Sequence, residues 1–515
     1  MSQALDEVVE LFEPATELVS VMAGSRSPAV LGLDIGTSGV RAALFDEKGG
    51  EISGASIRIN PRTLTLGADG FVDADLLLEQ VAQTLDALFA KLYESSFRIE
   101  LISVSCFWHS LMGVDDSEQP TTPVLGWLDT RASAAAEQLQ ATLDGKKFHQ
   151  RTGCRFHPSY WPAKLLRLKT EEPESWARTT RWLSFAEYLA LEFFGETAVS
   201  VSMASGTGLL DQHTCEWDGE LLHALDVPLE MLPQIATPTR TFQSLNYEYA
   251  VRWPQLSEAR LFPAIGDGAA NNIGEGCVSA ATMTLMIGTS GAMRMLVEGT
   301  PPADLSSALW CYRADRNRIV IGGALSDGGS LYNWIRESLL YGDDLLTIED
   351  ELQYLPPDGH GLTVLPFWLG ERSPGWNTNA QGGIFGMTLN TRPIEVLRAA
   401  MEGVAYRFAL VARELDRFAP SAKLVASGRA LTSSPTWAQI IADVLGRSLL
   451  LSEKTEASTR GAALLALEAT GRIDSISDVT FSVATSFEPD QSRHERYQEG
   501  LKRQQQLYER VISKA

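Results

Sequence analysis

The pentapeptide Ile-Gly-Thr-Ser-Gly occurs twice in this chain, in "GLDIGTSGVRAALF" at residues 32–45 and in "LMIGTSGAMRML" at residues 285–296. In each copy an apolar segment precedes the pentapeptide and an arginine follows it. The first glycines, Gly36 and Gly288, lie about half of the chain apart, which is too far for a solenoid repeat. The repetition therefore predicts two similar domains that face one another.

The length and charge of the chain agree with this prediction and exclude several classes of partner. A chain of 515 residues exceeds what one hydrophobic core usually organises, so two domains of about 250 residues each are expected. The formal net charge of −22 would repel nucleic-acid backbones and anionic membranes, and we expect neither as a partner. The five cysteines are scattered and odd in number, which favours reduced thiols in a cytoplasmic protein.

The sequence divides into three parts. Residues 1–28 form an acidic tail without an export signal, residues 29–276 an N-terminal domain and residues 277–515 a C-terminal domain. Short apolar segments alternate with helical patterns in both domains, so the fold class is α/β. The uncharged run 276–293 contains the second pentapeptide and many small residues, and we interpret it as a buried strand and turn rather than a membrane span.

Each pentapeptide is a candidate phosphate-binding turn. Glycine lets the backbone approach an anion, and the hydroxyls that follow can donate hydrogen bonds. A single copy would more often be a plain hairpin with glycine at a positive φ, but two copies at equivalent places favour a pair of turns that hold a nucleotide triphosphate. The candidate residues are Gly36, Thr37 and Ser38 in the first turn and Gly288, Thr289 and Ser290 in the second.

Two aspartates are candidates for the chemistry. Asp34 precedes the first turn and would repel a phosphate unless a cation lay between them, so it is a candidate partner of Mg²⁺, directly or through water. Asp267 lies among small residues in "AIGDGAANNIGEGC" and could orient an attacking hydroxyl and accept its proton. A helix cap is an equally good interpretation of Asp267 from the local sequence alone.

At this point the sequence resembles the FGGY carbohydrate kinases. The most specific segment is "GGIFGMTLNTRPIEVLRAAME" at residues 382–402, and "LPFWLGERSPGWNTNAQG" just before it looks like the Gly-Glu-Arg-x-Pro loop of that family. The resemblance implies a fold of two ribonuclease-H-like domains of the actin/hexokinase type around an ATP cleft. It also implies that ATP is the phosphate donor and that Mg²⁺ assists.

The resemblance assigns roles to several positions of this chain. It implies that Asp267 is the catalytic base, that the turns at Thr37 and Thr289 hold the ATP phosphates and that Asp34 lies near the metal. Further residues implied at the nucleotide site are Arg41, Gly329, Asn333, Gly428 and Arg429. Arg429 stands where the family usually has a second glycine, so its side chain could crowd the adenine or stack on it.

Four segments look closer to gluconate kinases than to xylulose, glycerol or ribulose kinases. They are "FWHSLMGVD", "RTGCRFHPSYWPAKLL", "SMASGTGLLD" and "IGTSGAMR". The expected reaction is therefore phosphorylation of D-gluconate to 6-phospho-D-gluconate. The candidate substrate residues are Trp108, His109, Trp127, Asp129, Arg131 and Asp267, with His157 as a further candidate.

Three alternatives remain open at this stage. The chain could phosphorylate a ketopentose or polyol, it could be an actin-like ATPase without a sugar substrate, or it could be a degenerate binding protein. A homodimer is as open as a monomer. Glu187, Asp211 and the other scattered acids are interpreted as solvated surface charges.

Overall fold

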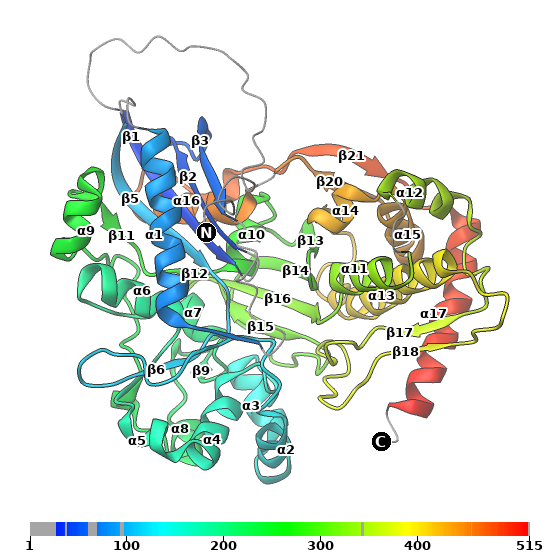
Figure 1. Ribbon diagram of the computed structural model, residues 1–515, viewed down its shortest axis with the longest axis horizontal. Helices are drawn as coiled ribbons and strands as arrows, with labels where there is room; N and C mark the ends of the chain where they lie inside the picture. The colour runs from blue at the N-terminus through cyan, green and yellow to red at the C-terminus, as the bar shows by residue number, and fades with distance from the viewer. Residues whose placement is uncertain are drawn as a thin grey trace, which may run out of the picture.

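The computed structural model describes residues 27–36, 39–59, 70–92, 97–340, 344–454 and 456–512. These residues form two halves, each built around its own β-sheet with helices packed on the sheet faces (Figure 1). The predicted α/β class is confirmed in both halves. The proposed acidic tail lies outside the described residues, except that its last two positions already belong to the first strand.

The N-terminal sheet combines an antiparallel meander with parallel strands. Its strands are β1 (Ser27–Gly36), β2 (Gly39–Phe45), β3 (Glu51–Ile59), β5 (Phe97–Cys106), β11 (Arg260–Leu261) and β12 (Ile265–Gly266). β1 pairs antiparallel with β2, which pairs antiparallel with β3, while β1, β11 and β12 all pair parallel with β5. Strands β1 and β2 are buried nearly throughout because both sheet faces are covered.

The C-terminal sheet repeats this plan. In spatial order its strands are β15 (Trp310–Arg313), β16 (Arg318–Leu325), β14 (Gly291–Glu298), β13 (Thr282–Ile287), β19 (Lys423–Ser427), β20 (Leu449–Ser452) and β21 (Val483–Phe487). β13, β14 and β16 are antiparallel, and β19 and β20 continue parallel to β13. The β13–β14 pair therefore holds the place of β1–β2, and each Ile-Gly-Thr-Ser-Gly segment joins one of these equivalent pairs, as the repetition predicts.

Helices and short strand pairs complete both halves. The short pairs are β4 (Phe71–Val72) with β7 (Val124–Leu125), β6 (Met112–Val114) with β8 (Arg181–Leu183), β9 (Leu210–Asp211) with β10 (Glu216–Trp217), and β17 (Thr363–Leu365) with β18 (Gly383–Phe385). The helices as far as the second sheet are α1 (Ala74–Lys91), α2 (Ser133–Thr142), α3 (Gly145–Thr152), α4 (Trp161–Glu171), α5 (Pro173–Arg178), α6 (Phe185–Phe194), α7 (Val201–Ser205), α8 (Gly219–Leu225), α9 (Tyr247–Arg252) and α10 (Asp267–Gly274). Those beyond it are α11 (Gly329–Leu339), α12 (Leu345–Tyr354), α13 (Pro393–Leu415), α14 (Arg429–Ser433), α15 (Pro435–Leu445), α16 (Ala457–Ala469) and α17 (Gln491–Val511).

Two helices cover opposite faces of the N-terminal sheet, and they come from opposite ends of the chain. The buried side of α1 packs with the face of β1 that carries Leu31 and Leu33. The other face, which carries Val30 and Phe45, packs against α16 (Figure 1). A segment far along the sequence is therefore part of the core of the N-terminal half, which no local pattern indicated.

One predicted surface acid is buried. Glu187, expected to be solvated, is 2% exposed in the first turn of α6, where its Oε2 accepts the Ser184 N–H at 2.9 Å. That prediction is wrong because α6 buries most of its circumference, and burial raises the pKa of Glu187 to about 7. Asp211 is half-buried and accepts the backbone N–H of His213 at 2.8 Å.

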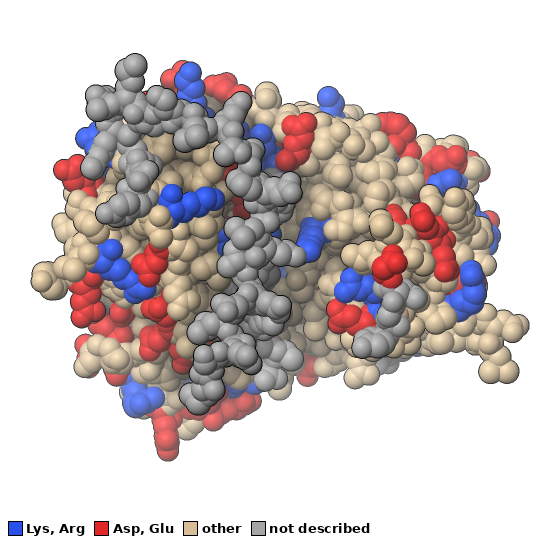
Figure 2. Space-filling view, turned by 45° about the horizontal axis from the view of Figure 1, so that its top comes forward, with Lys and Arg blue, Asp and Glu red and all other residues tan. Residues whose placement is uncertain are grey.

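The cysteine thiols lie in the interior of the protein, and charges of both signs lie on its surface. All five cysteines are buried and free, as the scattered spacing predicts. Figure 2 shows acidic and basic side chains interspersed over the coloured part of one face. Among the helices that the structure describes, none has both the length and the apolar character needed to cross a bilayer. The run 276–293 contains β13 and the turn after it, so it is strand and turn as predicted.

Candidate active site

Three parallel strands of the N-terminal half end side by side, and predicted site residues follow each of them. The register places the ends of β1 and β12 beside the end of β5. Gly36 ends β1, Trp108 and His109 follow β5, and Asp267 follows β12. The carboxyl edge of parallel strands is where α/β proteins bind ligands. The fold therefore brings together the first phosphate turn, two acceptor candidates and the candidate base.

Asp267 is the first residue of α10 and lies in a mostly buried position. The N-cap of α10 is Gly266, and the Asp267 carboxylate accepts the neighbouring Gly268 N–H at 2.8 Å and the backbone N–H of Trp108, so its interpretation as a helix cap is wrong. Burial raises the pKa of Asp267 to about 6, the Arg294 guanidinium opposes that rise, and the Asp34 carboxylate adds to it. A carboxylate with this pKa is ionised at neutral pH and still basic enough to accept a proton from a hydroxyl.

Asp34 faces the same edge of the sheet and is 3% exposed. Its Oδ2 accepts Arg41 Nη1 at 2.6 Å, and its Oδ1 accepts Ser105 Oγ at 2.8 Å. Arg41 also lies 3.6 Å from the carboxylate of Glu456, just before α16. Each Asp34 oxygen keeps one lone pair beyond these bonds, so the carboxylate can still meet a hydrated cation.

The second phosphate turn is joined to the start of α11 by backbone hydrogen bonds. Gly288 N–H donates to Ser290 O at 2.9 Å, Gly329 N–H donates to Gly288 O at 2.8 Å, and Ser330 N–H donates to Thr289 O at 3.0 Å. Thr289 is exposed, so its hydroxyl is accessible to a ligand, and Ser290 is half-buried. These bonds hold the turn against the N-terminus of α11, so the Thr289 hydroxyl and the positive end of the helix dipole lie side by side.

The loop after β19 lies beside the end of β13 and completes the candidate nucleotide site. Gly428 has a φ of +98°, and a Cβ on it would lie 2.4 Å from Ile287 O, so only glycine lets this loop approach the end of β13. Arg429 begins α14 with an exposed side chain, and Asn333 is exposed on α11. The structure thus brings Gly428, Arg429 and Asn333 around the second turn.

Arginines from both halves converge beside the two turns. Burial lowers the pKa of Arg58 on β3, Arg41 lowers it further, and Arg429 contributes from the C-terminal half. Glu456 and Asp34 oppose these effects. A local positive field of this kind accommodates a polyphosphate on a chain of net charge −22.

Trp108 and His109, two acceptor candidates, belong to an aromatic cluster built by both halves. Trp108 donates its Nε1–H to Ser202 O at 2.9 Å, and its ring meets the edge of Tyr312 with centroids 4.8 Å apart. His109 meets the edge of Tyr160 at 5.0 Å, and the Tyr160 and Tyr312 hydroxyls are 2.6 Å apart. Because Tyr312 belongs to β15, this aromatic cluster joins the two halves.

His109 is a neutral hydrogen-bonding group. It has a φ of 72°, and its Nδ1 lies 2.5 Å from Gly206 O, which can only accept, so Nδ1 carries the proton. Burial lowers the pKa of His109 to about 3. Its Nε2 is therefore an acceptor at neutral pH and suits a sugar hydroxyl. Lys164 fixes the segment by donating to His109 O at 2.7 Å.

Asp129 and Arg131, two predicted substrate residues, bind each other. Asp129 accepts Arg131 Nε at 2.9 Å and Nη2 at 2.8 Å, and the guanidinium lies 4.6 Å from the Phe71 ring centroid. In the described part of the chain neither side chain is hydrogen-bonded to Asp267. Asp129 and Arg131 therefore form an ion pair within their own loop.

Trp127 and His157 lie beside the Gly-Glu-Arg-x-Pro loop. The guanidinium of Arg372 is 4.2 Å from the Trp127 ring centroid. His157 Nδ1 accepts Ser159 N–H at 3.2 Å, and the ring also bonds to the backbone of Glu371. Burial lowers the pKa of His157 to about 3, so this imidazole is neutral as well.

Sequence reasoning missed two buried arginines of the site. Arg294 follows the second pentapeptide, is 4% exposed and has its Nη2 3.5 Å from Asn271 Oδ1. Arg372 belongs to the Gly-Glu-Arg-x-Pro loop and is 8% exposed. Burial lowers the pKa of both guanidinium groups. The arginine after each pentapeptide was the available signal for Arg294, but only Arg41 was assigned a role.

The site residues fit a magnesium nucleotide. A Cβ on Gly36 or Gly288 would meet no atom closer than 3.5 Å, so both turns leave space for a ligand, and the Arg41 Nε, 3.6 Å from the Glu456 carboxylate, makes no hydrogen bond among the described residues. Asp34 supplies hard oxygen ligands of the type that Mg²⁺ prefers. Thr37 and Ser38 of the first turn lie outside the described residues.

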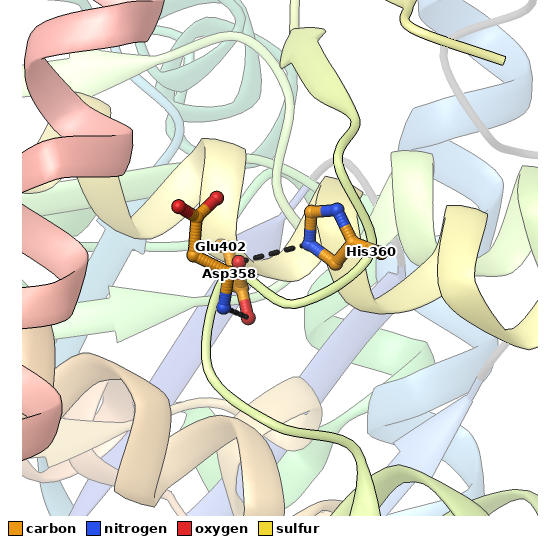
Figure 3. Close-up of side chains that lie close together, drawn as sticks. All are labelled: Asp358, His360 and Glu402. Atoms are coloured by element: carbon orange, nitrogen blue, oxygen red, sulfur yellow. Dashed lines mark hydrogen bonds and ion pairs between the residues drawn. The ribbon is translucent and has the colours of Figure 1, made fainter.

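A second cluster of metal-ligand side chains lies away from this site (Figure 3). Asp358, His360 and Glu402 come within 4.8 Å of one another. His360 Nδ1 accepts Leu362 N–H at 3.0 Å, so its Nε2 carries the proton that reaches Glu402 Oε2, also at 3.0 Å. Arginines already neutralise both carboxylates: Arg398 binds Glu402, and Arg496 and Arg503 bind Asp358. This cluster is therefore a buried ion-pair network that ties α17 to α13, with no lone pair on His360 for a metal.

Comparison with known proteins agrees with the fold. Residues 29–274 match the N-terminal domain of the FGGY family of carbohydrate kinases, and residues 283–470 match the C-terminal domain of that family. A gluconokinase of Bacillus subtilis (strain 168) is 28% identical over 474 residues, which cover 89% of this chain and 91% of that protein. A xylulose kinase of Lactococcus lactis subsp. lactis is 26% identical over 492 residues, 93% of this chain and 96% of that one.

A solved structure shows the same architecture. The gluconate kinase from Lactobacillus acidophilus superposes with a TM-score of 0.84 at 27% identity, covering 94% of this chain and 98% of that one. Together with the two family models, this superposition establishes the two-domain kinase fold around a nucleotide cleft. The chain belongs to the FGGY family of carbohydrate kinases and is an ATP-dependent sugar kinase.

Proposed function

We propose that this kinase phosphorylates the 6-hydroxyl of D-gluconate, giving 6-phospho-D-gluconate and ADP. The observation that carries the chemistry is the position of Asp267, with a pKa of about 6, at the sheet edge where Gly36 ends β1 and Trp108 and His109 follow β5. Gluconokinases are among the relatives, and the segments that resemble them include the strand end at His109 and the loop at His157. Both features support a polyhydroxy acid as the acceptor.

The proposed mechanism depends on position rather than on a covalent intermediate. The Asp267 carboxylate orients the 6-hydroxyl and accepts its proton while the hydroxyl oxygen forms a bond to the γ-phosphorus of ATP. The bond from that phosphorus to the β,γ-bridging oxygen breaks, and ADP carries away the electron pair. His109 Nε2 accepts a hydrogen bond from a sugar hydroxyl, and Trp108 covers C–H surface of the carbon chain.

The nucleotide is held from both halves. The turn at Thr289, the start of α11 and Arg41 would hold the phosphates, while Arg429 and Asn333 would lie on the side of the base. Asp34 is the residue to hold Mg²⁺, directly or through water, and the cation would offset the phosphate charge during transfer.

The test is coupled ADP release from the purified protein with Mg-ATP and a panel of acceptors. We expect kcat/KM for D-gluconate to exceed those for D-xylulose, D-ribulose, L-ribulose and glycerol by at least about 100-fold, with little release when no sugar is added. A ketopentose kinase is the second candidate, because a xylulose kinase aligns over 96% of its length at 26% identity. Release stimulated chiefly by D-xylulose would replace the gluconate assignment with that one.

A further inference from the structure

A cavity of about 640 Å³ lies between the two halves and shares no residue with the candidate active site. One wall comes from the N-terminal half and consists of α2, α3 and residues 155–156. The other wall comes from the C-terminal half and consists of residues 304–307 and the C-terminal end of α13 with the residues after it. Small-molecule sites in proteins occupy about 300–1,000 Å³, so a metabolite fits this space.

The two walls are hydrogen-bonded to each other where β15 begins. Gln150 on α3 donates from Nε2 to Leu305 O at 2.9 Å, and its Oε1 accepts Leu305 N–H, also at 2.9 Å. His149 Nε2 donates to Leu309 O at 2.9 Å. The cavity therefore lies at the joint between the halves, where a relative movement of the halves would change the separation of its walls.

The charged side chains of the cavity do not balance. Its cations are Lys146, Arg155 and Arg417, and its carboxylates are Asp304 and Glu414. Arg417 serves both carboxylates, at 3.8 Å from Asp304 Oδ2 and 3.3 Å from Glu414 Oε2. Across the described ranges of the chain, neither Lys146 nor Arg155 has an Asp or Glu oxygen within 4.0 Å. Two positive charges are thus left without partners on a chain whose net charge is −22.

Arg155 is the cation whose charge is least compensated. It is half-buried, and burial lowers the pKa of its guanidinium. Among the described residues its one hydrogen bond reaches the opposite wall, from Nη1 to Ser307 O at 3.5 Å, which is long for such a bond. His149 on α3 adds no charge, because burial lowers its pKa to about 4. An anion in the cavity would remove the cost of this partly desolvated guanidinium.

The lining favours a small polar ligand with two anionic groups. Guanidinium and ammonium groups bind phosphate and carboxylate through charge-assisted hydrogen bonds, and two such cations are available. Apart from Gly145, Phe156 and Leu305, every lining residue has a polar or charged side chain. Gln140 uses its Nε2 on Phe156 O, at 2.7 Å, so its Oε1 can accept a ligand hydroxyl. This lining does not suit a lipid or an aromatic ligand.

We propose that this cavity binds a small metabolite with two anionic groups, held by Arg155 and Lys146, and that the bound metabolite opposes closure of the kinase. A ligand that contacts both walls stabilises the separation that the structure shows, whereas ATP and the acceptor favour a closed arrangement. Ligand and substrates should therefore weaken each other's binding by the same factor. This regulatory site does not depend on which sugar is phosphorylated.

Binding is tested by titration calorimetry of the full chain without nucleotide or acceptor. The probes are 3-phospho-D-glycerate, with a phosphate and a carboxylate, succinate, with two carboxylates, and D-glycerate, with one. We expect at least one dianion to bind about tenfold or more tightly than D-glycerate, and the tighter dianion shows which anionic group is preferred. Arg155→Gln and Lys146→Gln should each raise its Kd by about tenfold or more.

The matched control for these variants is Lys48→Gln. Lys48 is exposed in the turn between β2 and β3, and it also has no carboxylate partner within the described ranges. Its replacement should leave the Kd of both dianions unchanged. Because Lys146 is exposed as well, its substitution should not disturb folding and keeps the test available if Arg155→Gln fails to fold.

The effect on closure is tested by steady-state kinetics with Mg-ATP and whichever acceptor the substrate panel identifies. The tighter dianion should raise KM for both substrates by at least about fivefold and then reach a plateau, because the ligand and substrates occupy different sites. Without the dianion, Arg155→Gln and Lys146→Gln should keep kcat and both KM values close to those of the wild type. With it, both variants should be inhibited only at about tenfold higher concentrations.

Three results would overturn the proposal. Failure of both dianions to bind the wild type at concentrations up to about 10 mM would show that the cavity is not an anion site. Binding that neither Arg155→Gln nor Lys146→Gln weakens would place the ligand elsewhere. Binding without any change in KM, or inhibition that rises without a plateau, would show that the ligand does not act on closure. A failure of the gluconate assignment would appear in the substrate panel alone and leaves the binding test unaffected.

Discussion

Asp267, Arg294 and Arg372 are charged groups that the fold keeps largely out of water. Burial raises the pKa of the aspartate and lowers the pKa of both arginines, so each charge is held against its solvation preference. Side chains with shifted pKa values in a cleft are typical of catalytic sites, where stability is given up for function. The effect of such a buried charge on activity and stability can be measured by substituting the residue that carries it.

The pH dependence of the reaction should report on Asp267. Its pKa of about 6 requires kcat/KM for the acceptor to be level above that pH and to fall about tenfold per pH unit below it, as the base becomes protonated. Arg294→Gln should move this fall to higher pH, because Arg294 opposes the rise in pKa. Steady-state kinetics across pH 5 to 9, with Mg-ATP saturating, would check both. A profile that stays level to pH 5 would remove Asp267 as the titrating base.

The Asp267→Asn variant should be less active and more stable than the wild type. Turnover should fall by orders of magnitude because the amide cannot accept the proton. The folded-state pKa lies above the unfolded value of 3.8, so the ionised carboxylate disfavours folding, and this penalty is fully present above pH 6. Removing it should raise the free energy of unfolding at pH 8 by the order of 1–3 kcal/mol. Denaturant unfolding checks the gain, which should disappear near pH 4.

Glu402 should contribute stability without taking part in catalysis. It is 1% exposed and binds Arg398 at 2.8 Å, so Glu402→Gln would leave a buried guanidinium poorly compensated and cost about 3–5 kcal/mol. Although burial alone raises the pKa of Glu402, His360 and Arg398 lower it below 4.5. Its contribution is therefore present above pH 4.5 and lost as the pH falls through the folded-state pKa. Glu414→Gln, on the same helix, should cost less than about 1 kcal/mol.

At the scale of elements, α10 and α16 cross with their backbones in close approach. A Cβ on Gly461 would lie 1.8 Å from Ala270 O, and one on Gly274 would lie 1.7 Å from Ala457 O. Arg460 Nη1 donates to Gly274 O at 2.6 Å across the same crossing. Because Asp267 begins α10, this crossing fixes where Asp267, the proposed catalytic base, lies relative to the N-terminal sheet.

Gly461→Ala should therefore impair stability and activity together. The helices must separate to admit the new methyl group, which should cost about 1–3 kcal/mol or more, and displacement of Asp267 by about 1 Å should reduce kcat by about 100-fold. Thermal unfolding and steady-state kinetics measure the two effects. The control is Gly219→Ala on α8, where a Cβ would meet nothing within 4 Å. A Gly461→Ala enzyme with normal kcat would show that the crossing does not position the base.

Local patterns predicted the elements well, and contacts between distant elements poorly. Asp73 accepts the N–H groups of Asp75 and Leu76 as an N-cap should, and the repeated pentapeptide led directly to the equivalent strand pairs. Neither the place of α16 on the N-terminal sheet nor the burial of Glu187 could be read locally, since both depend on which element packs opposite. Arg372 was inside a quoted motif, but only the folded chain shows that it lacks a carboxylate partner.

At the scale of the whole molecule, the residues proposed for the reaction come from both halves. Arg41 and Asp267 belong to the N-terminal half, whereas Thr289 and Arg372 belong to the C-terminal half. The halves are already joined through β15, where Cys311 N–H donates to Gly153 O at 3.0 Å and Arg313 Nε donates to Gln212 O at 2.9 Å (Figure 1). Substrates that bind both halves are therefore expected to draw them together about this junction.

Closure should require both substrates and should suppress hydrolysis. Small-angle scattering should give a smaller radius of gyration with a non-hydrolysable Mg-ATP analogue plus D-gluconate than with either ligand alone, because each ligand alone leaves some contacts between the halves unmade. ADP release without sugar should be at least about 1,000-fold slower than with it, since water cannot complete the closed site as a bound sugar does. Rapid sugar-independent hydrolysis with no further compaction on adding gluconate would favour an actin-like ATPase over a kinase that closes on its acceptor.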